Sequence, residues 1–277
     1  MIKTILVGID GSEHARTATG YALWLGQRFG ATVIGLHVVD IVAIEGSFFH
    51  DISGSLGFEP YLDFSSKMRD VLNERGKALL QGFSDEAAKV NVRSDIVLST
   101  GVVANEIAEQ ARTADLVVIG HRGVNEKFST GLLGSTAESV TRKCPRPVLI
   151  SAADFRVVTH PVLAYDGSQR AAAAMHAAAE FCTSLSLPLT VLTVAKDAES
   201  GDRTISDARK YLASYSLECT YTVQTGNAPE QIVAFLKQGC DLLFIGAYGH
   251  SRIIEMVLGS TTEYVLRNAS CPVFLNR

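Results

Sequence analysis

Glycines recur at fixed spacings in two loops, each of which follows a run of apolar residues. In the later loop, Gly246 and Gly249 are followed after nine residues by the pair Gly259-Ser260. Glycine adopts backbone conformations that other residues avoid, and it lets a ligand approach main-chain amides closely. A helix beginning near Ser260 would add unpaired amides and the positive end of its dipole. This combination is suited to holding a polyphosphate.

The same residues have a purely structural interpretation. Ser260 and Glu263 have the spacing of a capping box, as do Ser135 and Glu138 in the earlier loop. In that motif the serine caps the helix and the glutamate reaches back to the cap residue. A helix capped in this way, with a glycine before it, needs no ligand.

Asp-Gly-Ser follows the first apolar run of each half of the chain, at Asp10 to Ser12 and at Asp166 to Ser168. The tripeptide is a common turn signal, because aspartate hydrogen-bonds readily within its own turn. Ser12 and Ser168 are expected to be N-caps of the helices that follow. A ligand site gains support because these turns and the glycine loops are expected at the same edge of a sheet.

The chain repeats itself once. The matching segments are 5–40 with 162–197, 100–123 with 225–249, and 134–150 with 259–275. The first half carries extra residues, which fall mostly within 41–66. We therefore predict two copies of one domain, at residues 1–152, with the insertion at about 41–66, and at residues 159–277.

The insertion is rich in aromatic side chains: Phe48, Phe49, Phe58, Tyr61 and Phe64. Loops longer than about 12–15 residues are uncommon unless they are functional or disordered. Three interpretations remain open, namely a lid over a site, a surface for a protein partner, and a simple cover for exposed core.

Strands and helices alternate in the pattern of an α/β fold. Short apolar runs predict strands buried on both faces at 3–9, 32–38, 93–98, 115–119 and 147–151. Helices are expected at 13–29, 67–89, 104–113 and 135–143. Such an order predicts an open parallel sheet with helices on both faces. Ligands bind such sheets beyond the carboxyl ends of the strands, at a topological switch point, and both loop types lie at such ends.

The spacing Gly246-x2-Gly249-x9-Gly259-Ser260 resembles the ATP-binding pattern of the universal stress protein family. The opening ILVGIDGS, the later LHVVD and the closing CPRPVLI and CPVFL extend the resemblance over nearly the whole chain. The chain thus resembles a tandem universal stress protein. The resemblance implies two Rossmann-like parallel α/β domains and, as in some members, bound ATP with a divalent metal such as Mg²⁺ or Mn²⁺.

The resemblance also implies roles for single residues. In the second copy it assigns adenine or ribose contacts to Asp166 and adenine contacts to the backbone of Val194. It assigns the phosphates to Gly246, Gly249, Gly259, Ser260 and Thr261. The corresponding residues of the first copy are Asp10, Val38, Gly120, Gly123, Gly134, Ser135 and Thr136. There ten residues, not nine, separate the second and third glycines, so the second domain is the preferred nucleotide site.

Composition and missing motifs exclude several classes of protein. A net charge of −4 without a basic block argues against a nucleic-acid partner. No apolar stretch approaches the roughly 18 residues of a membrane span. The five cysteines form no Cys-x-x-Cys pair, which favours reduced thiols in the cytoplasm. Neither a P-loop lysine motif nor a Gly-x-Ser-x-Gly elbow is present. We therefore assign no catalytic residue, and metal ligands stay unknown.

These observations predict a cytoplasmic stress-response protein in which ATP binding switches conformation or the choice of an unidentified protein partner. One alternative is a slow ATP hydrolase in which Asp10 or Asp166 holds a metal. Another is a scaffold that binds no nucleotide and acts through the aromatic insertion. The two domains are expected to pair through the strands near 147–151 and 273–276, as an intramolecular pseudo-dimer, and the whole chain could form a homodimer.

Overall fold

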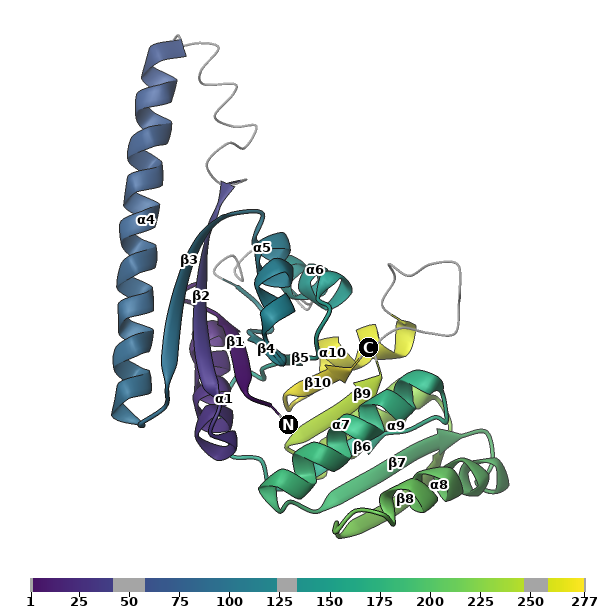
Figure 1. Ribbon diagram of the computed structural model, residues 1–277. Helices are drawn as coiled ribbons and strands as arrows, with labels where there is room; N and C mark the ends of the chain where they lie inside the picture. Colours follow the sequence, from purple (N-terminus) through teal and green to yellow (C-terminus); the bar gives the residue numbers. More distant parts are fainter. Residues whose placement is uncertain (1, 42–57, 124–133, 247–258, 277) are drawn as a thin grey trace.

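A single ten-stranded sheet forms the centre of the protein (Figure 1). The computed structural model describes residues 2–41, 58–123, 134–246 and 259–276, with side chains of 58–65 left out. The strand order across the sheet is β3 (Ser94–Gly101), β2 (Thr32–Asp40), β1 (Thr4–Gly8), β4 (Leu116–Ile119), β5 (Val148–Ile150), β10 (Val273–Asn276), β9 (Leu242–Gly246), β6 (Pro161–Ala164), β7 (Leu189–Ala195) and β8 (Cys219–Thr225). Every neighbouring pair is parallel except β5 with β10. Read outward from that pair, the two halves therefore have corresponding strand orders, β5-β4-β1-β2-β3 in the first and β10-β9-β6-β7-β8 in the second.

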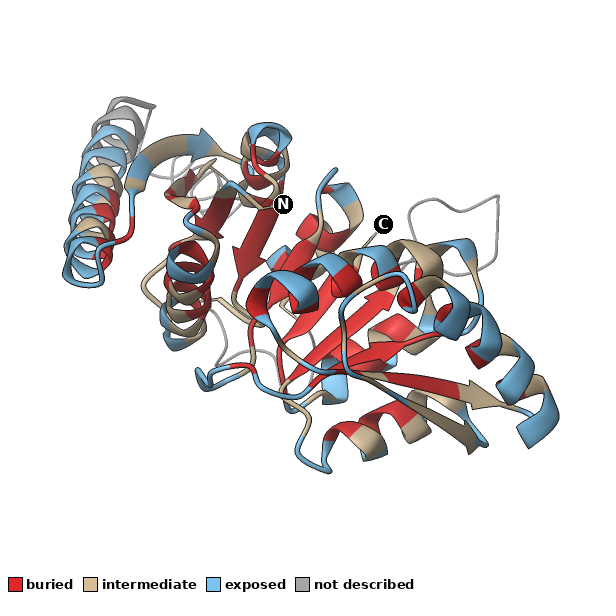
Figure 2. Cartoon of the chain, turned by 60° about the horizontal axis from the view of Figure 1, so that its bottom comes forward, coloured by how far each residue is buried: buried red, intermediate tan, exposed pale blue. Residues whose placement is uncertain are grey.

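Helices cover both faces of the sheet, as the alternating pattern predicts. One face is packed by α1 (Glu13–Phe29), α4 (Phe58–Lys89), α7 (Gln169–Leu185) and α8 (Ala198–Leu212). The other is packed by α5 (Val103–Gln110), the 3-10 turn η1 (Ala111–Thr113), α6 (Ser135–Lys143), α9 (Ala228–Leu236) and α10 (Ser260–Asn268). Figure 2 shows the central strands buried between these layers, with exposed residues on the outer helix surfaces.

The predicted strands of the first copy are all present within a few residues of the expected bounds, and the predicted parallel α/β fold is confirmed. The prediction for the insertion is wrong in part. Helix α4 begins at Phe58, nine residues before the expected start, so residues 58–66 are helical. Pro60 lies in the first helical turn, where the missing amide hydrogen costs nothing. Residues 42–57, with Phe48 and Phe49, lie outside the described residues.

The two halves are joined by antiparallel pairing of β5 with β10, as expected from the final strands of each copy. Val148 lies opposite Leu275, and Ile150 lies opposite Val273. The aromatic ring of Phe181 packs edge-on against rings from both halves beneath this seam. Its centroid is 5.5 Å from that of Phe29 in the first half and 5.3 Å from that of Phe244 in the second. One hydrophobic core thus runs across the junction.

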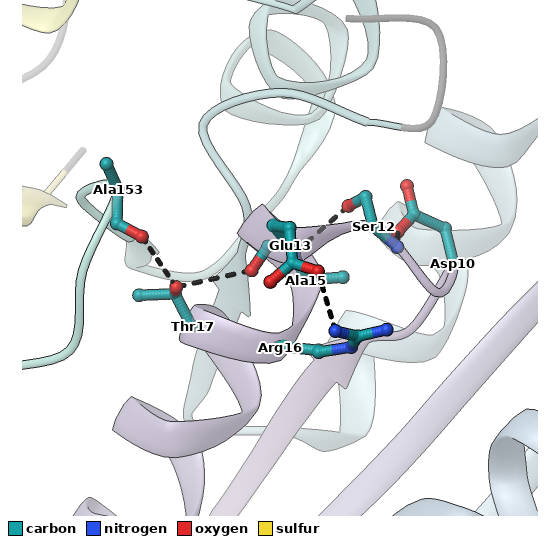
Figure 3. Close-up of polar contacts among 7 residues, drawn as sticks. All are labelled: Asp10, Ser12, Glu13, Ala15, Arg16, Thr17 and Ala153. Atoms are coloured by element: carbon teal, nitrogen blue, oxygen red, sulfur yellow. Dashed lines mark hydrogen bonds and ion pairs between the residues drawn. The ribbon is translucent and has the colours of Figure 1, made fainter.

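The connection between the halves is bound to helix α1. The hydroxyl of Thr17 donates to the carbonyl oxygen of Ala153 at 2.8 Å (Figure 3). The hydroxyl oxygen of Tyr21 accepts from the backbone amide of Arg156 at 3.2 Å, and burial raises the pKa of this phenol. The ring of Phe155 packs edge-on against Tyr21, with centroids 4.8 Å apart. The connecting segment is therefore part of the packed structure.

All five cysteines are free thiols. Burial raises the pKa of Cys182 and of Cys271 to about 12, so both stay protonated at neutral pH. Buried protonated thiols behave as small apolar side chains.

We predict that Phe181→Ala destabilises both halves together. The side chain is 4% exposed and contacts both halves, so its removal leaves a cavity that costs about 3–5 kcal/mol. Urea unfolding, followed by tryptophan fluorescence in the first half and by hydrogen exchange in the second, should show both transitions at lower urea. The control Val71→Ala removes a side chain that is 64% exposed and should change stability by about 0.5 kcal/mol or less. Loss of stability in one half alone would contradict a shared core.

Candidate functional site

The strand order reverses direction at β1, which lies between β2 and β4 in the first half. The connections that leave β1 and β4 therefore diverge and leave a crevice at the carboxyl edge of the sheet. The second half repeats this arrangement with β6 between β7 and β9. The Asp-Gly-Ser turns follow β1 and β6, and the glycine loops follow β4 and β9. The structure thus brings both predicted elements to one edge in each half.

The Asp-Gly-Ser turn of the first half is fixed by its own side chains (Figure 3). One carboxylate oxygen of Asp10, Oδ1, accepts from the backbone amide of Ser12 at 2.8 Å. Gly11 between them has a φ of +83°, a left-handed conformation that favours glycine. The hydroxyl oxygen of Ser12 accepts from the amide of Ala15 at 3.1 Å and so caps α1. The predicted N-cap is confirmed, and one oxygen of Asp10 remains outside the turn.

The second half has the same turn. Asp166 accepts from the amide of Ser168 at 2.9 Å, and Gly167 has a φ of +78°. Ser168 caps α7 by accepting from the amide of Ala171 at 3.1 Å, which confirms the second predicted N-cap. Asp166 is exposed, whereas Asp10 is half-buried.

Asp10 faces the glycine loop that follows β4. A Cβ atom on Gly123 would lie 3.0 Å from Oδ2 of Asp10, the oxygen that the turn does not use. The carboxylate of Asp10 therefore lies against the expected phosphate loop. The family resemblance implies a position at the adenine or ribose end instead. Gly249, the corresponding glycine of the second half, lies outside the described residues.

The first glycine of each loop is required by packing alone. A Cβ on Gly120 would lie 2.9 Å from the backbone carbonyl carbon of His14 in α1. A Cβ on Gly246 would lie 2.7 Å from that of Arg170 in α7. Side chains cannot fit at this distance, so both positions need glycine whether or not a ligand binds. The close approach places the ends of β4 and β9 against the first turns of α1 and α7.

The start of α6 and of α10 differs from the predicted capping box. The N-cap residues are Gly134 and Gly259, and Ser135 and Ser260 are the first helical residues. The glutamate of each motif pairs with an arginine four residues later instead of reaching back, as in the 2.5 Å contact of Glu263 with Arg267. The capping-box interpretation is therefore wrong. A glycine cap offers no side chain to the first amides of the helix, which leaves them available to an anion.

Thr136 and Thr261 lie in the first turns of these two helices, next to Ser135 and Ser260. Ser135, Thr136 and Ser260 are exposed, and Thr261 is half-buried. The backbone amide of Gly134 donates to the carbonyl of His121 at 3.1 Å. The start of α6 is thus tied to the loop that follows β4.

Val38 lies near the carboxyl end of β2, where β2 extends past its neighbour β1. Val194 lies in the same way near the end of β7, which extends past β6. The carbonyl of Leu36 accepts from the amide of Ile9 at the end of β1. Backbone groups of alternate residues in a parallel strand point to the same neighbour, so those of Val38 point to the side on which β1 has ended. Val194 has the same relation to Leu192, whose carbonyl faces the end of β6. Both valines therefore direct backbone groups toward the crevice.

His121, in the loop after β4, reaches the other half of the chain. The residue is half-buried, and its Nε2 atom donates to the carbonyl oxygen of Leu266 in α10 at 2.8 Å. Because a carbonyl only accepts, Nε2 carries the proton. The contact links the loop after β4 with a helix of the other half, and nothing in the sequence pattern indicated it.

Among the described residues, no group of three or more histidine, cysteine, aspartate or glutamate side chains could hold a metal ion. No helix in the described part of the chain is long and apolar enough to cross a membrane.

Comparison with known proteins identifies the family. The model of the family described as "Universal stress protein family" matches twice, at residues 1–151 and 159–277. Universal stress protein Slr1230 of Synechocystis is 30% identical over 287 residues that cover 100% of both chains. Universal stress protein MJ0531 of Methanocaldococcus jannaschii is 31% identical over 152 residues, which cover 54% of this chain and 82% of the relative.

A solved structure supports the fold over the full length. The crystal structure of a universal stress protein from Archaeoglobus fulgidus has a TM-score of 0.77 and covers 99% of this chain and 98% of its own. Its 20% sequence identity makes this a likeness of fold alone. Because the family model matches both halves and a full-length relative is 30% identical, the chain belongs to the universal stress protein family and carries two of its domains in tandem.

Proposed function

We propose that the protein binds ATP at the crevice of its two domains, residues 1–152 and 159–277, and that occupancy switches its conformation or its protein partner. The observation that carries the proposal is the start of α6 and of α10. Each helix begins at a glycine, its first residues are largely exposed, and it lies at the carboxyl edge beside the strand-order reversal. Uncapped helix amides combined with the helix dipole form a site for phosphate.

The neighbouring groups fit the rest of a nucleotide. The backbone of Val38, or of Val194 in the second domain, offers one donor and one acceptor to the edge of adenine. The amides near Gly134 and Ser135 face the phosphates in the first domain, as do those of Gly259, Ser260 and Thr261 in the second. Gly120 and Gly246 allow the ends of β4 and β9 to approach α1 and α7 closely. Asp166 stands at the second crevice, in the place for ribose.

The position of Asp10 argues for a divalent cation in the first domain. Its Oδ2 atom faces Gly123, where the phosphates are expected. Two like charges about 4 Å apart repel by about 4 kcal/mol at an effective dielectric constant near 20. Mg²⁺ or Mn²⁺ between the carboxylate and the phosphates would reverse the sign of this interaction. Mg²⁺ commonly binds through one or two carboxylates and the phosphates of the ligand.

We predict that Gly259→Asp weakens ATP binding at the second site at least tenfold without loss of stability. Gly259 has φ −58° and ψ 142°, a conformation open to any residue. Aspartate is also a good N-cap, so α10 should be as stable as before or more stable. The new carboxylate would occupy the amides and repel phosphate. Calorimetric titration with ATP and Mg²⁺ gives the affinity, and thermal unfolding gives the stability.

The matched control is Gly259→Asn, which caps the helix with a side chain of nearly the same size but no charge. It should weaken ATP binding less than Gly259→Asp does. Unchanged ATP affinity in the aspartate variant would refute phosphate binding at α10.

We predict that Asp10→Asn makes ATP binding at the first site less dependent on Mg²⁺. Asparagine can still accept from the amide of Ser12, so the turn should persist. The variant is made in the Gly259→Asp background, which leaves the first site to be measured. Affinity with Mg²⁺ should fall severalfold, while affinity in the presence of EDTA should rise because the repulsive charge is gone. An Mg²⁺ dependence identical to that of the parent would contradict cation binding by Asp10.

Measurement of phosphate release separates a switch from a slow hydrolase. We expect purified protein that binds ATP to release phosphate no faster than the Gly259→Asp, Asp10→Asn double variant. Release that falls in this variant together with ATP binding would identify the protein as an ATPase.

A further inference from the structure

A cavity of about 270 Å³ lies where the two domains meet, beside the paired residues Ile150 of β5 and Val273 of β10. The first domain contributes His14 at the start of α1, His121 and Arg122 from the loop after β4, and Ser151 after β5. The second domain contributes Arg267 and neighbouring residues at the end of α10. The cavity is therefore lined by parts of both halves.

This cavity adjoins the nucleotide crevice of the first domain, because His121 and Arg122 lie between Gly120 and Gly123 of the expected phosphate loop. Neither Asp10 nor Val38 lines it. Its volume is just below the roughly 300–1,000 Å³ typical of sites for drug-sized ligands. It therefore has ample room for a small anion such as phosphate.

The lining favours negative charge. The lining includes two guanidinium groups, of Arg122 and Arg267, and two imidazole rings, of His14 and His121. None of the described lining residues is acidic. The ring centroids of the two histidines are 6.2 Å apart. Glu263 contacts one nitrogen of Arg267 at 2.5 Å. Because a guanidinium group has five N–H donors, this pair still leaves donors for a second acceptor.

Several of these groups are held in place by contacts of their own. His121 donates to the carbonyl of Leu266 in the other domain at 2.8 Å. The hydroxyl of Ser151 donates to the backbone carbonyl of His14 at 3.3 Å, which ties the end of β5 to the start of α1. A site whose groups are fixed before binding loses less entropy when a ligand arrives.

We propose that the cavity binds a small phosphate-bearing anion between Arg122 of the first domain and Arg267 of the second. Guanidinium groups match the geometry of phosphate oxygens with paired N–H donors. The ligand would bridge the two domains and strengthen their contact. Arg122 belongs to the loop that the first nucleotide crevice also uses, but Arg267 and the other residues of the second domain do not, so anion binding here does not require ATP in either crevice.

The test uses inorganic phosphate as the probe for the full chain, measured by calorimetric titration without nucleotide and again with saturating ADP. Phosphate should bind in both conditions. Arg267→Gln should weaken phosphate binding at least tenfold, because it removes a charge-assisted contact. Arg267→Lys, which keeps the charge but loses the paired donors, should give an intermediate affinity.

Arg142→Gln is the matched control. Arg142 occupies the corresponding place in α6 and pairs with Glu138 four residues earlier. Its side chain is 37% exposed, compared with 38% for Arg267, but it does not line the cavity. Phosphate affinity should change less than twofold in this variant, and thermal unfolding should show that all three variants fold.

Three results would overturn the proposal: no phosphate binding, equal weakening by Arg142→Gln and Arg267→Gln, or full displacement of phosphate by ADP. Displacement would place phosphate in the nucleotide crevice instead. ATP titration of the same variants is read separately, so failure of nucleotide binding is distinguishable from failure of this site.

Discussion

The close approach of two backbones at the carboxyl edge of the sheet determines the geometry of both crevices. A Cβ atom placed on Gly120 would lie 2.9 Å from the backbone of His14 in α1. One placed on Gly246 would lie 2.7 Å from the backbone of Arg170 in α7. Only glycine fits there, and in the first half the following loop lies beside the Asp-Gly-Ser turn, with Gly123 next to Asp10. Duplication of the domain has preserved this contact at Gly120 and Gly246. The Asp-Gly-Ser turns and the strand register then place the carboxylates and the valine backbones at the same edge.

The two kinds of helix start in each domain are chemically different. Helices α1 and α7 begin with serine caps that satisfy an amide, and they need nothing further. Helices α6 and α10 begin at glycine, and their glutamates pair with arginines along the helix. A glycine N-cap in place of a serine costs only a few tenths of a kcal/mol, so α6 and α10 begin without a capping side chain at little loss of stability. A phosphate ligand gives a physical reason for this difference, since a capping side chain would compete with it.

Much of the fold could be predicted from the sequence, because buried parallel strands are short apolar runs and the chain contains the pattern twice. Ser12 and Ser168 were identifiable as caps from their place after Asp-Gly. Ser135 and Ser260 were assigned to the wrong helix position, since a capping box and a glycine-capped helix with serine at its first residue look alike in sequence. The start of α4 at Phe58 was missed because aromatic residues beside glycines also suit a loop. The contact of His121 with Leu266 joins residues 145 positions apart, and no local pattern encodes such a pairing.

Equilibrium dialysis of the purified full chain against ATP with Mg²⁺ tests the central claim most directly. The account predicts saturable uptake of at least one ATP per chain, because helix amides without side-chain caps stand at the edge of both domains. Uptake that stays at zero up to millimolar ATP, in protein shown to be folded, would contradict it and leave the glycine loops as purely structural elements.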